Sequence, residues 1–205
     1  GSIVDINHMC HSSVCIFIQR NGGKIIRMRD VIRVIDVCKR FGDDEVLKHI
    51  SFDFEEGGIY GIVGNNGSGK TVLMKCICGF LPVTTGTIRV FGKEIGRDVD
   101  FPESLGVIIE TPGFLTQYTG AKNLEILADM KRMISKADIR LILKKVGLDP
   151  DMKKPVGKYS LGMRQRLGIA QAIMEDPRFL ILDEPTNHLD IISRENLENA
   201  LEQFE

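Results

Sequence analysis

Apolar positions in the first half of the chain group into short runs that are typical of β-strands. The runs VIRVIDV (31–37) and VLKHISFDF (46–54) are rich in strand-forming residues, and in the second run Ile50, Phe52 and Phe54 face one side. We expect these two runs to pair as antiparallel strands. The next run, IYGIV (59–63), is apolar throughout, which is typical of a strand buried in a parallel sheet.

Helical periodicity follows directly after this run. In residues 70–80, Leu73, Ile77 and Phe80 are spaced for one helix face. After two further strand-like runs, GTIRVFG and LGVII, residues 112–165 carry apolar positions three and four apart with no strand between them, which predicts a helical lobe. A strand returns in RFLILDEP and a final helix in ISRENLENALEQF, so the pattern predicts an α/β fold.

Composition excludes some classes of function. The 205 residues suit one lobed unit, and Lys+Arg at 27 against Asp+Glu at 28 gives no basic field, so no nucleic-acid partner is indicated. No apolar run approaches the roughly 20 residues of a membrane span, so a function at a membrane needs another chain to cross it. The odd count of five cysteines suits a reducing compartment, which favours a cytoplasmic location.

Residues 1–27 differ from the rest of the chain. The opening Gly-Ser is typical of a tag-cleavage scar, and the segment has neither the basic region nor the cleavage site of a signal peptide. We interpret it as a disordered, non-native leader, with the native start at Met28. Its His8, Cys10, His11 and Cys15 lack the paired C-x-x-C spacing of structural zinc sites, so a metal there is disfavoured.

A glycine-rich segment connects the strand at 59–63 to the helix from residue 70. Residues 64–71, GNNGSGKT, match the pattern G-x-x-x-x-G-K-[ST] between a predicted strand and a predicted helix. The glycines allow backbone N–H groups to point inward at phosphate oxygens, and the helix directs its positive end to the same place. Lys70 is expected at the β- and γ-phosphates and Thr71 on Mg²⁺. The alternative is a glycine-rich surface turn.

Two acidic residues follow an apolar strand later in the chain. The run FLILD (179–183) ends in Asp183, which is placed to hold Mg²⁺ through water, and Glu184 can orient or deprotonate the attacking water. The alternative is a strand followed by an acidic helix cap. Cys76 and Cys78, on the helix after the glycine-rich segment, are interpreted as packing residues.

With these motifs in this order, residues 31–204 resemble the nucleotide-binding domain of ABC transporters. Phe41 stands where that family stacks an aromatic ring on adenine, and Glu110 occupies the position of the Q-loop glutamine, a metal ligand. Residues 159–163, YSLGM, stand at the family signature, with Ser160 and Gly162 as phosphate contacts, and NHLD (187–190) fits the D-loop. The phosphate-loop residues that the resemblance assigns to the nucleotide are Gly64, Asn65, Asn66, Gly67, Ser68, Gly69, Lys70, Thr71 and Val72.

The resemblance implies a fold, cofactors and partners. The fold is a P-loop NTPase core whose first part, with the antiparallel β subdomain and the phosphate loop, spans residues 28–111. An inserted helical subdomain with the signature spans 112–165, and the second, truncated part of the core spans 166–205. The cofactors are ATP and Mg²⁺, with Glu184 and Lys70 as catalytic residues of an ATPase. The partners are a transmembrane permease subunit and a second nucleotide-binding subunit that meets this one head to tail, on the inner face of the cell membrane.

The sequence departs from the family pattern in three places. Glu110 replaces a neutral amide by a carboxylate, and Tyr159, Leu161 and Met163 alter the signature. The family's switch histidine, some thirty residues beyond the position of Asp190, has no counterpart before residue 205, so we expect a truncated chain that lacks one sheet strand. Glu110 and YSLGMRQRLGIA resemble exporters of drugs and antimicrobial peptides; the alternatives are a fragment that binds ATP with little turnover and a non-transport ABC ATPase.

Overall fold

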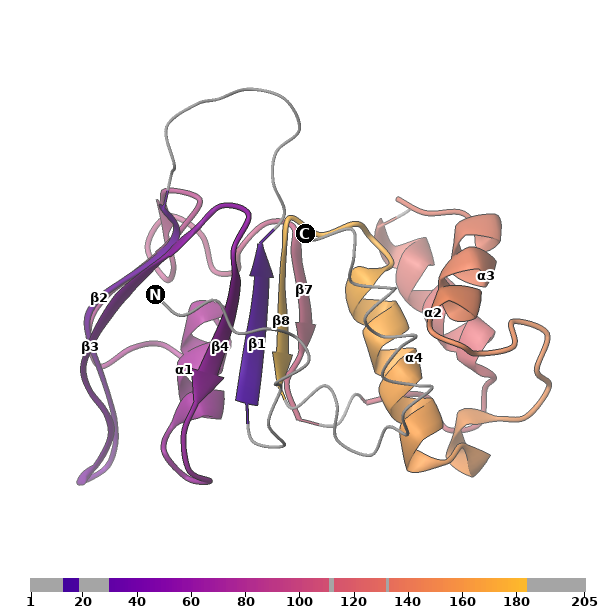
Figure 1. Ribbon diagram of the computed structural model, residues 1–205, viewed down its shortest axis with the longest axis horizontal. Coiled ribbons are helices and arrows are strands. Elements are labelled where there is room, and N and C mark those ends of the chain that lie inside the picture. The colour runs from indigo at the N-terminus through magenta and orange to yellow at the C-terminus, as the bar shows by residue number, and fades with distance from the viewer. Residues whose placement is uncertain (1–12, 19–29, 111–112, 132, 184–205) are drawn as a thin grey trace.

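The computed structural model describes residues 13–18, 30–110, 113–131 and 133–183. These residues form two four-stranded sheets on one side of the molecule and a group of helices on the other (Figure 1). The strand order is β4-β1-β8-β7 in the core sheet and β3-β2-β5-β6 in the second sheet. The α/β class predicted from the hydrophobic pattern is therefore confirmed.

The second sheet is antiparallel throughout. Strand β2 (Asp30–Phe41) pairs with β3 (Asp44–Glu55) on one side and with β5 (Thr85–Val90) on the other, and β6 (Lys93–Glu94) closes the edge. The antiparallel pair predicted for runs 31–37 and 46–54 is confirmed.

The core sheet contains the strand that precedes the phosphate loop and the strand that ends at Asp183. Strands β7 (Leu105–Ile108) and β8 (Phe179–Asp183) are parallel, and β1 (Ser13–Ile18) is antiparallel both to β8 and to β4 (Ile59–Val63). It follows that β4 and β8 run in the same direction, and Figure 1 shows their arrows pointing the same way with β1 reversed between them. The carboxyl ends of β4 and β8 therefore share one edge of the sheet.

Strand β1 corrects two expectations. Residues 13–18 belong to the segment interpreted as a disordered leader, yet they form the strand between β4 and β8, and the side chain of Ile16 has no solvent exposure. The described neighbour of β4 is thus antiparallel rather than parallel. The physical reason is that SVCIFI is a strand-forming apolar run whose backbone finds hydrogen-bonding partners on both sides.

Helix α1 (Lys70–Ile77) lies in the hydrophobic core that joins the two sheets. Leu73, Met74, Cys76 and Ile77 are buried there, as predicted for Leu73 and Ile77, whereas Phe80 lies beyond the end of the helix and is half exposed. Burial raises the pKa of the Cys78 thiol to about 12, so the thiol stays protonated and acts as a packing group, as predicted.

The remaining helices form a second hydrophobic core. Helices α2 (Gly120–Lys131), α3 (Lys136–Lys145) and α4 (Leu161–Ile173) pack around Leu124, Leu143 and Leu167, and a 3-10 turn (Val156–Lys158) precedes α4. Helix α4 also packs against β7, so it connects the hydrophobic core of the helices to the sheet β4-β1-β8-β7 (Figure 1). The helical lobe predicted for residues 112–165 is present, and α4 crosses its expected end at 165.

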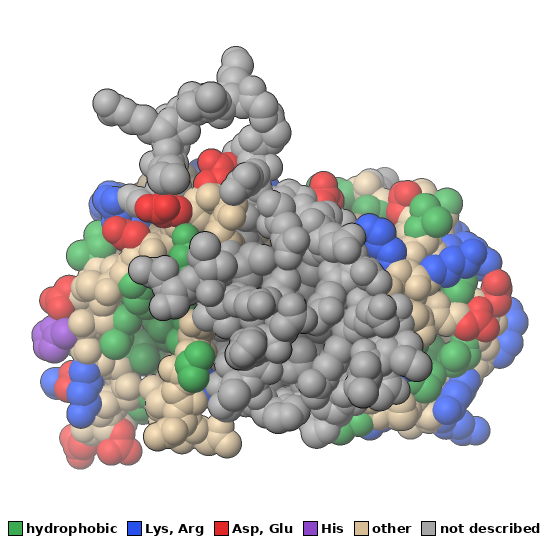
Figure 2. All heavy atoms as spheres, viewed as in Figure 1, with side chains coloured by type: hydrophobic (Ala, Val, Ile, Leu, Met, Phe, Trp, Pro, Cys, Tyr) green, Lys and Arg blue, Asp and Glu red, His purple; other side chains and the backbone are tan. Residues whose placement is uncertain are grey.

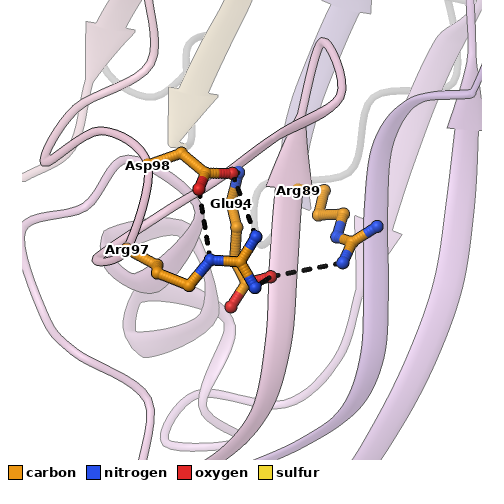
Figure 3. Close-up of polar contacts among 4 residues, drawn as sticks. All are labelled: Arg89, Glu94, Arg97 and Asp98. Atoms are coloured by element: carbon orange, nitrogen blue, oxygen red, sulfur yellow. Dashed lines mark hydrogen bonds and ion pairs between the residues drawn. The ribbon is translucent and has the colours of Figure 1, made fainter.

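A network of charged side chains fixes the turn after β6. Glu94 accepts bonds from Arg89 and Arg97, and its backbone N–H donates to Asp98 at 2.9 Å (Figure 3). That N–H, together with Arg97, lowers the pKa of the Asp98 carboxyl. The turn borders a hollow of about 510 Å³ near the C-terminal end of α1. Figure 2 shows acidic and basic side chains mixed around the described rim of the molecule, in keeping with its near-neutral charge.

Among the helices of the described ranges, none combines the length and the apolar character needed to cross a lipid bilayer.

The placement of β1 predicts a stability difference between two isoleucines. Ile16→Ala should lower the free energy of unfolding by about 2–5 kcal/mol, because it leaves a cavity between fully packed strands. The matched control Ile35→Ala, on β2 at a residue that is 43% exposed, should lower it by less than about 1 kcal/mol. Urea unfolding followed by circular dichroism measures both; equal losses would contradict the central position of β1.

Candidate functional site

The phosphate-loop motif lies between β4 and α1, as the pattern predicted. The loop turns on glycines in the left-handed region, with φ of 81° at Gly67 and 89° at Gly69. At Gly69 a side chain would also be crowded, since a Cβ atom would lie 3.0 Å from Leu47 and 3.2 Å from Val46. Ser68 N donates to Asn65 O at 3.1 Å, which closes the turn. The sequence therefore uses glycine here because the backbone conformation requires it.

The N-terminus of α1 opens onto this loop. Gly69 is its N-cap residue and provides no side-chain hydrogen bond, and the first turn holds no acidic residue. The first-turn N–H groups and the positive end of the helix dipole are thus available to an anion at the loop. Val72 lies half-buried in this turn and packs against the core that joins the sheets.

Lys70 reaches back over the phosphate loop. Its Nζ donates to the carbonyl oxygen of Gly64 at 2.6 Å and to that of Asn65 at 3.0 Å. These two bonds hold the ammonium group above the same turn whose glycines shape the loop. The residue predicted to contact the β- and γ-phosphates is therefore positioned by the loop itself.

Thr71 and Asp183 meet at the shared edge of the core sheet. Thr71 Oγ1 donates to Asp183 Oδ2 at 3.0 Å, although the two residues are 112 positions apart in the chain. A hydroxyl and a carboxylate are hard oxygen donors of the kind that Mg²⁺ prefers, and this ion commonly takes only one or two protein ligands beside phosphates and water. In the described ranges no three His, Cys, Asp or Glu side chains gather as a closed metal site. The donor set fits Mg²⁺ that is shared with a phosphate.

Glu110, predicted as a third metal ligand, has a different contact. It follows β7 with φ of 62°, and its Oε1 lies 2.6 Å from Lys75 Nζ. In this arrangement its carboxylate is paired with a lysine on α1. Sequence reasoning did not single out Lys75, although its position four residues after Thr71 on a predicted helix was a readable signal.

Phe41, the predicted adenine platform, lies at the end of β2 and is 47% exposed, with Lys39 Nζ 5.0 Å from the centroid of its ring. It pairs with Asp44 across the β2–β3 hairpin. The same hairpin brings Val46 and Leu47 against Gly69, so the exposed ring is carried on an element that contacts the phosphate loop. An exposed aromatic face in this position can stack on a nucleotide base.

The signature residues lie at the start of α4. Ser160 is the N-cap of that helix, and its Oγ accepts a bond from Met163 N at 3.2 Å. Buried Tyr159 accepts a bond from Gly120 N at 3.2 Å, which ties the signature to the start of α2; sequence reasoning treated this tyrosine only as a departure from the family. Gly162 lies in the first turn of α4.

Within one chain the signature and the phosphate loop belong to different parts of the molecule. Helix α4 packs against β7, at one edge of the core sheet, whereas α1 packs against β3 and β5 (Figure 1). The structure thus brings together Lys70, Thr71 and Asp183, and carries Ser160 and Gly162 on the helical lobe. Glu184 and the D-loop residues 187–190 lie outside the described residues.

Comparison with known proteins gives a consistent result. Residues 47–187 match the family described as ABC transporter. The chain is 45% identical over 160 residues to an uncharacterised ABC transporter ATP-binding protein, YybJ, of Bacillus subtilis (strain 168), covering 78% of this chain and 73% of that protein. It is 42% identical over 178 residues to the bacitracin transport ATP-binding protein BcrA of Enterococcus faecalis, covering 86% of this chain and 58% of that protein.

Two further similarities extend the comparison. The lantibiotic transport ATP-binding protein SrtF of Streptococcus pyogenes is 35% identical over 175 residues, which is 85% of this chain and 75% of that protein. A solved structure of the ATP binding subunit of an ABC transporter has a TM-score of 0.71 at 25% identity and covers 85% of this chain and 75% of that chain. The chain thus spans about three quarters of some relatives and little more than half of BcrA. On the strength of the family match, these identities and the phosphate loop joined to Asp183, the chain belongs to the ABC transporter family of ATP-binding proteins.

Proposed function

We propose that this chain binds ATP with Mg²⁺ and hydrolyses it as the nucleotide-binding subunit of an exporter for antimicrobial peptides. The observation that carries the proposal is the hydrogen bond between Thr71 and Asp183, since it places two oxygen ligands for Mg²⁺ at the base of a phosphate-binding loop. The names of BcrA and SrtF, which refer to bacitracin and lantibiotic transport, support the class of substrate.

The residues divide the work of binding and hydrolysis. The loop amides and Lys70 bind the phosphates, and Phe41 supports the base. When bound, Mg²⁺ neutralises charge on the phosphates; Thr71 and Asp183 would hold it. Glu184, by its place after Asp183, accepts the proton of the attacking water as the bond between the γ-phosphorus and the bridging oxygen breaks, giving ADP and phosphate.

Closure of the site requires a second nucleotide-binding subunit. Ser160 accepts its capping bond through a lone pair, which leaves the hydroxyl proton free to donate to a phosphate oxygen. Because Ser160 is the N-cap of α4, the positive end of the helix dipole lies beside this hydroxyl. Because this helix packs at the β7 edge of the sheet, away from α1, the phosphate that it contacts is the one held by the partner subunit. Opening and closing of the pair drives a separate membrane subunit, on the cytoplasmic face of the cell membrane.

Removal of the Thr71 hydroxyl tests the metal end of the site. Thr71→Val keeps the side-chain shape but removes the bond to Asp183, so ATP affinity in Mg²⁺ should fall at least about tenfold while affinity in EDTA changes little. Thr71→Ser, the matched control, should bind as the parent does. Titration with a fluorescent ATP analogue, with and without Mg²⁺, measures this. If Thr71→Val binds ATP in Mg²⁺ as tightly as the parent does, Thr71 is not a ligand of the metal ion.

The proposed contact between Ser160 and the partner's phosphate predicts that a negative charge at this position prevents dimerisation. A Glu184→Gln variant should form an ATP-dependent dimer, measured by size exclusion with light scattering, because slow hydrolysis retains the phosphates that join the subunits. Adding Ser160→Asp should abolish the dimer, since aspartate repels the partner's phosphate although it caps α4 as well as serine does.

Ser160→Asn is the control for this experiment, because asparagine caps equally well and carries no charge. It should keep the dimer, and all three variants should share one unfolding midpoint. A dimer that tolerates aspartate at this position, or a Glu184→Gln variant that stays monomeric in saturating MgATP, would contradict the proposed pairing.

A further inference from the structure

Lys75 and Glu110 form an ion pair beside the proposed nucleotide site. Lys75 Nζ and Glu110 Oε1 are 2.6 Å apart, with 28% of the lysine side chain and 63% of the glutamate side chain exposed. The pair joins α1, which begins at the phosphate loop, to the segment that leaves the core sheet after β7.

The lysine lies one helical turn from the metal-binding threonine. Residues four apart in an α-helix lie on one face, so Lys75 and Thr71 project from the same side of α1. Lys75 also lies in the last turn of this helix, where a positive charge interacts favourably with the helix dipole. Its ammonium group is thus the next positive charge along this face after the phosphate loop.

The glutamate follows a strand whose neighbour ends in a second carboxylate, Asp183. Strands β7 and β8 are parallel, with Ile108 opposite Leu182, so Glu110 and Asp183 leave neighbouring strands at the same edge of the sheet. Two carboxylates at this edge disfavour the approach of a triphosphate. One of them therefore needs a counter-charge when no metal ion is bound.

We propose that Lys75 is this counter-charge: it holds Glu110 and offsets its negative charge, so that a carboxylate can occupy this position without weakening nucleotide binding. Lys75 is a positioning residue, since it acts through Glu110 and not through contact with the nucleotide. Together the two side chains have no net charge, which is the electrostatic equivalent of a neutral amide at position 110. The inference rests on the proposed binding of ATP.

The test compares four variants by titration with a fluorescent ATP analogue in EDTA, where no metal ion screens the carboxylates. Lys75→Gln should weaken binding about five- to tenfold, the effect of one uncompensated charge at a partly solvated site. Glu110→Gln should bind at least as well as the parent. The affinity of the double variant should return to within about twofold of the parent value. Lys75→Arg keeps the positive charge and should have the parent affinity. The loss in Lys75→Gln should shrink as salt approaches 1 M, where the Debye length is about 3 Å.

A second ion pair provides the matched control. Lys93 and Glu103 are also 2.6 Å apart and exposed, but they join β6 to the loop before β7. Lys93→Gln should leave ATP affinity unchanged, and all variants should unfold at similar urea concentrations because exposed pairs contribute little stability. If the double variant binds as weakly as Lys75→Gln, or Lys75→Gln binds as the parent does, the inference is wrong while the proposed function stands. If the parent chain itself does not bind ATP, both fail.

Discussion

The candidate site depends on the direction of two strands. Strands β4 and β8 run the same way on either side of β1, so the phosphate loop and Asp183 emerge at one edge of the core sheet. The hydrogen bond from Thr71 to Asp183 then fixes the first turn of α1 to the end of β8. Without this geometry, the loop would bind an anion but would offer no oxygen ligands for a metal ion. In the proposed site, phosphate binding and metal binding thus depend on one structural feature.

The position of β1 is the main result that the hydrophobic pattern did not predict. Its run SVCIFI is rich in strand-forming residues, but it lies within residues 1–27, where the opening Gly-Ser indicates a non-native leader. Local pattern cannot reveal that the space between β4 and β8 is filled by a strand of opposite direction, because this depends on pairing between residues more than 40 positions apart. The two flanking strands provide hydrogen-bonding partners, and burial of Ile16 stabilises the arrangement.

Other parts of the site were predicted to different degrees. The phosphate loop, the start of α1 at Lys70 and the end of β8 at Asp183 follow from local motifs whose backbone requirements are strict, as at Gly69. The role of Glu110 was predicted from the family pattern alone, and its pairing with Lys75 is a tertiary contact between residues 35 positions apart in the chain. The same holds for Tyr159, whose buried hydroxyl joins two helices. Departures from the family pattern are therefore where the structure adds most.

In the proposed site, the loop amides, Lys70 and the Thr71–Asp183 pair recognise the nucleotide mainly through its phosphates. Isothermal titration calorimetry of the purified chain with MgATP and with adenosine in the same buffer tests this most directly. The predicted result is saturable binding of about one MgATP per chain and at least about a hundredfold weaker binding of adenosine, since adenosine offers no phosphate to the loop. Absence of binding heat with MgATP, or equal affinity for adenosine, would contradict the account.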